Sequence, residues 1–352
     1  MAMARMRRGP MPAERVSTTR GLRRTVALAV AVLAMYTPQA WAWGPQGHAT
    51  VGAIADQLLA GTPAEPKLRA LLQPGETLAQ VANWADCLKG PRVCNAELTP
   101  EMNAYVQANP LHREYHYTDV SIGSSGYRAG APGTTDHDIV QILLQCIQVL
   151  RGRTDAAANP HHFTQRQALL LVTHLVGDMH QPLHVGAIYL DEQGHPVEPR
   201  DEAQAQATTN DGGNKLHIDG DNLHLLHGFW DFEVVTAAMA KASATSPEDM
   251  ASRLLRASPG LVVVTDPQGA ILAWTNDSLL ASRSSLRELR YGSHRSYTGR
   301  NGQPVDGWDV MLPDTYADAS AALAKDRLTL GGKRLAALLQ ATLAATNDTH
   351  RP

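Results

Sequence analysis

The sequence predicts a mainly α-helical protein that folds as a single helical domain behind an N-terminal leader. Apolar residues recur at helical spacing in several segments, whereas strand patterns are few and short. No internal repeat and no convincing linker divides the chain. With 352 residues and 43% hydrophobic content, the chain is long enough and apolar enough to bury a sizeable core.

The first predicted element is a leader, because residues 1–42 differ in composition from the rest. They hold seven arginines, one acidic residue and the apolar run "TVALAVAVLAMY", which is too short to span a bilayer. The small-residue motif "AWA" ends at Ala42. We therefore predict a signal peptide, cleavage before Trp43, a domain over residues 43–352 and a periplasmic or secreted protein. An uncleaved anchor is the alternative, and the arginine pair before the apolar run leaves the Sec and twin-Arg export routes both open.

Helices are predicted next, from the periodicity of apolar residues. In the first, Val51, Ile54 and Leu58 share one face; in the segment before Leu150, Ile139 and Leu143 do so. The predicted helices cover residues 48–59, 78–86, 136–150, 164–180 and 221–240.

Helix-breaking residues define the remaining boundaries. Pro182 should end the apolar helix over 164–180. The polar tract from about Asp191 to Asn210 has no periodicity and is expected to be a loop. Two helices are expected within residues 314–345, with a break at Gly331-Gly332.

The charge of the chain limits the classes of function. The full chain has a net charge of −3, and removal of the leader would change this to −9. A protein that binds nucleic acid through phosphate contacts alone should be basic. If this protein handles phosphates, it should therefore do so with bound metal cations.

The three cysteines have different expected roles. Cys87 and Cys94 lie close together in sequence, and a disulfide between them is expected in an oxidising compartment. Cys146 lies in an apolar helical pattern and is predicted to be a buried, inert thiol. No C-x-x-C zinc spacing occurs.

Histidine and aspartate recur at a spacing that points to metal binding. His174 and Asp178 are four residues apart on one predicted helix, and His227 and Asp231 repeat that spacing on another. Residues four apart lie on the same helix face, one turn from each other. His184 follows the first pair. Either pair alone would more often be a packing or surface contact, but together they favour a metal site.

Three further candidates precede these pairs in the sequence: His48, Asp86 and His116. A set of nitrogen and oxygen ligands without thiolates suits zinc in a hydrolytic role, with positions left open for water. Several zinc ions close together could bind a phosphate, activate water and stabilise a leaving oxygen.

The order of these motifs resembles a known enzyme family. The pieces "WGPQGH", "WAD", "YHYTD", "HLVGDMHQPLH", "GGNKL" and "HGFWD" follow one another across nearly the whole chain after the leader. This pattern resembles the zinc-dependent single-strand-specific nuclease and 3′-nucleotidase family, which is related in fold to zinc phospholipase C. The long motif around His174 is highly specific, and the shorter ones gain weight from their order.

The resemblance implies three zinc ions per chain and assigns their ligands. It implies one zinc on Asp86, His116, His174 and Asp178, a second on His48, the α-amine and carbonyl of Trp43 and the shared Asp178, and a third on His184, His227 and Asp231. The motif "HLLHGFWD" also offers His224, but the family places the ligand four residues before the acid, which selects His227.

The resemblance also implies an endonuclease that acts on single-stranded DNA and RNA, and on 3′-nucleotides, to give 5′-phosphate products. Asp86, Lys89 and Asp178 are its expected catalytic residues. Four residues match positions around the family's substrate site: Lys89, Tyr117, Asp119 and Asn214. An aromatic ring there could stack on a base, which would favour unpaired strands. Ordinary loop polarity is the alternative explanation for all four.

Three other functions remain open from the sequence. A zinc phospholipase C would use the same ligands on a lipid headgroup and would need an apolar rim. A non-catalytic periplasmic zinc-binding protein would carry exposed, redundant histidines. A helical structural protein would tolerate loss of metal. No stable membrane association is expected, and the sequence does not define the oligomeric state.

Overall fold

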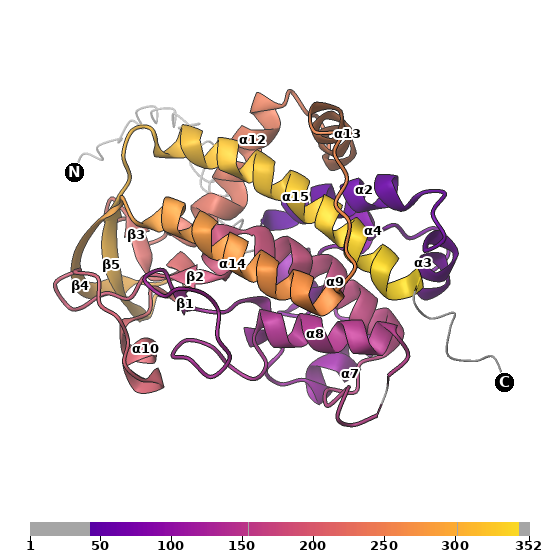
Figure 1. Ribbon diagram of the computed structural model, residues 1–352. Helices are drawn as coiled ribbons and strands as arrows, with labels where there is room; N and C mark the ends of the chain where they lie inside the picture. The colour runs from indigo at the N-terminus through magenta and orange to yellow at the C-terminus, as the bar shows by residue number, and fades with distance from the viewer. Residues whose placement is uncertain (1–42, 154, 301, 345–352) are drawn as a thin grey trace, which may run out of the picture. The chain divides into compact units, whose positions relative to one another are not determined.

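The computed structural model describes residues 43–153, 155–300 and 302–344 (Figure 1). The predicted signal peptide over residues 1–42 lies outside this part of the chain. The described residues form a mainly helical protein, as the sequence predicted. None of their helices combines the length and the apolarity needed to cross a bilayer.

The elements follow one another as helices with short strands between them. The α-helices are α2 (Gly44–Leu59), α3 (Glu65–Leu71), α4 (Leu78–Val81), α5 (Trp84–Cys87), α6 (Pro91–Cys94), α7 (Pro100–Ala108), α8 (Ile139–Leu150), α9 (Gln165–His180), α10 (Glu202–Thr208), α11 (Leu226–Gly228), α12 (Val235–Lys241), α13 (Pro247–Ala257), α14 (Pro267–Leu286) and α15 (Tyr316–Ala344). Short 3-10 turns are η2 (Glu114–His116), η3 (Pro182–His184) and η4 (Asp211–Gly213), and η5 (Phe229–Val234) is a π-helix.

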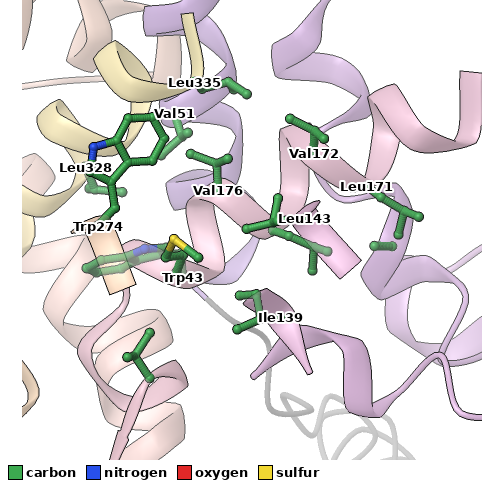
Figure 2. Close-up of a cluster of buried hydrophobic side chains, with 14 of the residues drawn as sticks. Trp43, Val51, Ile139, Leu143, Leu171, Val172, Val176, Trp274, Leu328 and Leu335 are labelled. Carbon is green, nitrogen blue, oxygen red and sulfur yellow. The ribbon is translucent and has the colours of Figure 1, made fainter. Parts of the chain in front are cut away.

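Helix α9 is the centre of the helical packing. It contacts α8, α14 and α15, and also α2 and α5 (Figure 1). Figure 2 shows the apolar cluster that results, to which Val176 of α9 belongs together with Trp43, Val51 and Leu328. The charged and polar groups on α9 are therefore surrounded by buried apolar side chains, which exclude water from them.

The strands form two small sheets. Strand β1 (Val120–Ser121) pairs in parallel with β2 (Gly186–Ala187). In the second sheet, β5 (Pro304–Met311) lies between β3 (Leu216–Ile218) and β4 (Arg290–Thr298). The prediction of only short strands was wrong for the β4–β5 hairpin. Strand β4 is mostly exposed and polar, so it lacks the apolar alternation by which strands are predicted.

The predicted break at Gly331-Gly332 is also wrong, because α15 runs through both glycines without interruption. A Cβ built on Gly332 would lie 2.4 Å from the Cβ of Ile54 on α2. The glycines therefore allow α15 and α2 to pack closely. This packing outweighs the cost of about 1 kcal/mol that each glycine brings to a helix interior.

Three other segments differ from their predicted bounds. The segment predicted as one helix over 78–86 forms two short helices, α4 and α5. The polar tract after Asp191 contains α10, whose N-cap is the Asp201 carboxylate. The predicted helix over 221–240 begins only at Leu226, because Leu225 forms a β-bridge with His217.

The cysteine predictions are confirmed. A disulfide links Cys87 to Cys94 and closes the loop between α5 and α6. Cys146 is a free thiol and is fully buried on α8. Its burial raises the pKa of the thiol, so the thiol stays neutral and unreactive.

Candidate metal centre

The first part of the site is built on helix α9. Thr164 begins the helix with a capping box to Gln167, and Pro182 follows its last residue. His174 and Asp178 are both fully buried, and the His174 Nε2 lies 3.1 Å from Asp178 Oδ2. The four-residue spacing thus places both side chains on one face of the helix.

Two further elements bring ligand-type side chains to this pair. Asp86, from α5, has its Oδ1 3.7 Å from His174 Nε2, and His116, from η2, has its Nδ1 2.9 Å from Asp178 Oδ2. The ligand atoms of His116, His174 and Asp178 lie within 4.8 Å of one another, as do those of His48, Asp86 and His174. Such groups could hold a metal ion.

His48, from α2, faces a different oxygen of Asp178 than His116 and His174 do. Its Nε2 lies 3.1 Å from Asp178 Oδ1, and its ring stacks on His174 with centroids 4.0 Å apart. A Cβ on Gly177 would lie 2.8 Å from His48 Nδ1, so only glycine allows this approach of α2 to α9. One oxygen of Asp178 thus faces His48, and the other faces His116 and His174.

A second group forms around Asp231, which lies in the π-helix η5. His227 Nε2 is 3.3 Å from Asp231 Oδ2, and the rings of His227 and His184 have centroids 5.0 Å apart. The Trp43 nitrogen donates to Asp231 Oδ1 at 3.1 Å. All four residues are buried. π-Helical turns often occur at functional sites, where they re-aim a side chain.

Backbone carbonyls orient three of the histidines. The Nδ1 of His174 lies 2.7 Å from the carbonyl oxygen of Ala82. His184 Nδ1 lies 2.8 Å from the His116 carbonyl, and His227 Nδ1 lies 2.7 Å from the Gly212 carbonyl. Each Nδ1–H therefore donates to a carbonyl, which leaves Nε2 as the ring atom that is available to a metal ion. This is the arrangement that histidine ligands of metals commonly use.

Burial and neighbouring charges set the protonation of these groups. Burial and the nearby Lys89 lower the pKa of His116 to about 4, and burial lowers that of His184 to about 3. Burial opposes the ionisation of Asp178, but the charges of His174 and His184 outweigh it and hold its pKa well below the usual range. Burial also opposes protonation of His174, but the neighbouring carboxylates, that of Asp178 first, outweigh it and raise its pKa. Near neutral pH the site therefore holds neutral His116 and His184 beside the ionised Asp178, and these are the forms that bind metal.

Several buried atoms in the site have no hydrogen-bond partner among the described residues. They are Asp86 Oδ2 and His184 Nε2, and also His48 Nε2, Asp178 Oδ1 and Asp231 Oδ2, which lie at ion-pair distance from a neighbouring ligand-type side chain but form no hydrogen bond. A buried polar atom without a partner costs free energy. These atoms come from residues predicted as ligands, so the residues present fit bound metal ions.

The substrate residues predicted from the sequence lie close in the chain to the candidate ligands or to η4. Lys89 Nζ lies 2.6 Å from Asp86 Oδ1 and is partly exposed. Tyr117 is half-buried, directly after His116. Asp119 accepts a hydrogen bond from Thr209 at 3.1 Å, while its buried Oδ1 has no partner within the described chain. Asn214 donates to the Asp211 carbonyl beside η4.

The structure separates His224 from His227. His224 is exposed, and its Nε2 lies 2.8 Å from Glu233 Oε1. His227 instead lies inside the buried group with Asp231. The spacing rule that selected His227 therefore also selects the buried residue.

One residue of the site was missed by sequence reasoning. Gln181 is fully buried and donates to Asp231 Oδ1 at 3.0 Å, while its own oxygen accepts from the Leu183 backbone. Gln181 therefore turns Asp231 Oδ2 toward His227. The motif "HQPLH" contained this glutamine, but nothing in the sequence indicated its partner 50 residues away.

The chain is similar in sequence to known proteins over most of its length. The S1/P1 Nuclease family matches residues 43–344. Endonuclease 2 of Arabidopsis thaliana is 24% identical over 92% of this chain and 98% of its own length. Endonuclease 4 of the same plant is 26% identical over 88% of this chain and 92% of its length. Nuclease S1 of Aspergillus oryzae is 24% identical over 90% of this chain and 96% of its length.

Proposed function

The chain belongs to the S1/P1 nuclease family and is a phosphodiesterase of the endonuclease class, and from this premise we propose its substrates, metals and products. It cleaves single-stranded DNA and RNA to give 5′-phosphate ends and also removes phosphate from 3′-nucleotides. The observation that supports this best is the set of unpartnered buried atoms on ligand-type side chains.

We assign three zinc ions per chain. S1/P1 nucleases are zinc-dependent, and the described residues contain two overlapping metal-type clusters. Asp86, His116, His174 and Asp178 would hold one ion, and Trp43 and His48 would hold a second together with Asp178. His184, His227 and Asp231 would hold the third. The two oxygens of Asp178, which face different histidines, suit a bridging role.

When bound, zinc supplies an activated water and neutralises charge on phosphate oxygens. The side chains of the protein bind the substrate and set the environment of the site. Lys89 places an ammonium at the edge of the site, where it can pair with a phosphate oxygen of the substrate. Arg113 donates to the Lys89 carbonyl and so fixes the backbone that carries it. The apolar packing around α9 keeps bulk water away from the ionised carboxylates, which strengthens their interactions.

Tyr117 and Asp119 bind the base. The Tyr117 ring provides a stacking face, and the unpartnered Asp119 Oδ1 accepts from an amino group of the base. Asn214 binds a phosphate oxygen or the ribose. A base paired within a duplex cannot leave its stack to make these contacts, which restricts cleavage to single strands.

The alternative functions fit less well. A zinc phospholipase C would share the ligands, but the relatives found are nucleases. A zinc-storage protein would expose its histidines, whereas His48, His174 and His184 are buried. We further propose that residues 1–42 are a signal peptide and that the protein acts in the periplasm or outside the cell.

Metal analysis joined to hydrolysis assays tests the proposal. The protein purified without its leader should contain about three zinc ions and should cleave single-stranded DNA and RNA much faster than duplex. Chelation should abolish hydrolysis, and zinc should restore it. Full activity in a verified metal-free sample, or hydrolysis of lecithin but not of nucleic acid, would contradict the proposal.

A further inference from the structure

A hollow in the protein lies apart from the metal ligands. It has a volume of about 620 Å³ and is lined by strand β1, by the loop after it and by the polar tract that follows β2. Val120, Ser121, Tyr127, Arg128 and Glu198 are among its lining residues. A hollow of this size can enclose a ligand as large as a nucleotide.

The hollow shares its backbone with the metal centre. Strand β1 follows the segment that carries His116, Tyr117 and Asp119, and its partner β2 follows His184. The Thr118 N–H donates to the His184 carbonyl at 3.0 Å, so the two segments are tied together at the ligands. A substrate strand that leaves the metal centre along β1 would pass over this hollow.

The charged groups of the hollow are not paired with each other. Arg128 is exposed, and no ion pair or side-chain hydrogen bond of its guanidinium occurs within the described chain. One Glu198 oxygen accepts from Ser121 at 2.6 Å, which leaves the other oxygen available. The hollow thus offers a free cation and a free acceptor to one ligand.

An aromatic ring completes the set. Tyr127 is half-buried, and its hydroxyl donates to Asp138 Oδ2 at 3.1 Å and accepts from Gln141 at 2.8 Å. These bonds fix the ring before a ligand binds, so that binding costs little side-chain entropy. A fixed aromatic ring beside a cation is the combination that binds single-stranded nucleic acid, because the ring stacks on a base and the cation contacts phosphate.

We propose that this hollow binds one nucleotide of the single-stranded substrate, away from the bond that is cleaved. Arg128 contacts its phosphate, Tyr127 stacks on its base, and Glu198 accepts from an amino group of the base. This inference rests on the proposed function, because it assigns a second contact to the same substrate. It predicts that longer strands bind more tightly than dinucleotides.

Steady-state kinetics on two substrates test the proposal. Arg128→Ala should raise KM for a single-stranded 10-nucleotide substrate about tenfold, the usual effect of losing one charged hydrogen bond. KM for a dinucleotide should not change, because a dinucleotide does not reach the hollow. Arg256→Ala, which removes another exposed arginine, on α13, is the matched control and should change neither value. Equal KM for the longer substrate in all three proteins would overturn the proposal.

Variants of Tyr127 separate stacking from folding. Tyr127→Phe keeps the ring and should retain most of the binding, whereas Tyr127→Leu should weaken it about tenfold. If Tyr127→Phe loses as much affinity as Tyr127→Leu at unchanged melting temperature, the ring does not stack on a base. That result would overturn this part of the proposal.

A direct binding measurement keeps the inference separate from catalysis. Fluorescence anisotropy of the zinc-loaded protein with a 2′-O-methyl phosphorothioate strand, which resists hydrolysis, gives affinity at several salt concentrations. Arg128→Ala should reduce the slope of log affinity against log salt by about 0.7, as expected for one lost phosphate contact. Binding of this strand, together with no hydrolysis of an unmodified single strand, would overturn the proposed function alone. An unchanged slope for Arg128→Ala in an active enzyme would overturn this inference alone. An effect of Arg128→Ala that is seen only with free 5′-mononucleotides would also overturn it.

Discussion

The buried carboxylates of Asp178 and Asp119 lie in the same protein but in opposite electrostatic surroundings. Asp178 has His48, His116 and His174 within about 3 Å of its oxygens. Burial opposes its ionisation, but the charges of His174 and His184 outweigh this and hold its pKa well below the usual range. Among the described residues, only Thr209 donates a hydrogen bond to the Asp119 carboxylate. Burial and the neighbouring Asp211 raise its pKa to about 7.

This difference separates two kinds of binding. A carboxylate that stays ionised when buried is prepared for cations, because its affinity does not depend on losing a proton. A carboxylate that is half-protonated near neutral pH can accept from or donate to a neutral base edge. The first environment suits metal binding, and the second suits contact with a nucleobase.

The largest expected effect is at Asp178. Asp178→Asn should lower kcat/KM by at least about a thousandfold, because it disturbs both zinc ions that it is proposed to bridge. Lys89→Ala, which removes a phosphate contact and the ion pair with Asp86 but no metal ligand, should cost less, about tenfold to a hundredfold. Zinc content and kinetics of both variants measure this. Similar mild losses in the two would count against a bridging carboxylate.

The next effect concerns Trp43, whose nitrogen lies at the metal centre. A free α-amine has a pKa of about 7.7–8.0, so a metal can displace its proton near neutral pH. A chain with an added, retained Met before Trp43 has an amide nitrogen there instead. It should hold about one zinc fewer and cleave single-stranded DNA far more slowly than a processed control. Equal zinc content and equal rates would show that the amine is not a ligand.

A smaller effect is expected at Gln181, which orients Asp231. Gln181→Met keeps the approximate side-chain volume but removes the hydrogen-bond donor. It should weaken zinc binding at the proposed site that contains Asp231 by about tenfold to a hundredfold. The Asp178 sites should keep their zinc. Competition with a chromophoric chelator measures the sites in order of affinity. A uniform weakening of all sites would instead indicate a general structural role.

The smallest effect is the pH dependence of stability at Asp119. Its folded pKa of about 7 lies above the ordinary value of 3.8, so folding favours the protonated form. The stability linked to this proton is complete below about pH 4 and is lost as pH rises through 7. When the pH is raised from 5 to 8, the free energy of unfolding of Asp119→Asn should therefore increase by about 2–4 kcal/mol relative to that of the wild type. Urea unfolding at both pH values measures the difference, and parallel pH profiles would refute it.

Sequence alone determined the helical class and most of the candidate site. The spacings of His174–Asp178 and His227–Asp231 depend only on helix geometry, which is local, so their shared faces could be predicted without a fold. Trp43, His48 and His184 were named through ordered motifs, and the structure places them in the same buried centre. The Cys87–Cys94 disulfide followed from a short loop.

How these pieces meet depends on packing between segments that are distant in the sequence. The Ala82 carbonyl that orients His174 is 92 residues away, and Gln181 reaches Asp231 across 50 residues. Gly331-Gly332 stays helical because α2 packs against it, although its local propensity indicates a break. Periodicity and propensity report only on neighbours along the chain. The desolvation that raises the pKa of Asp119, and the histidines that lower that of Asp178, depend on groups brought together by packing, which no local pattern encodes.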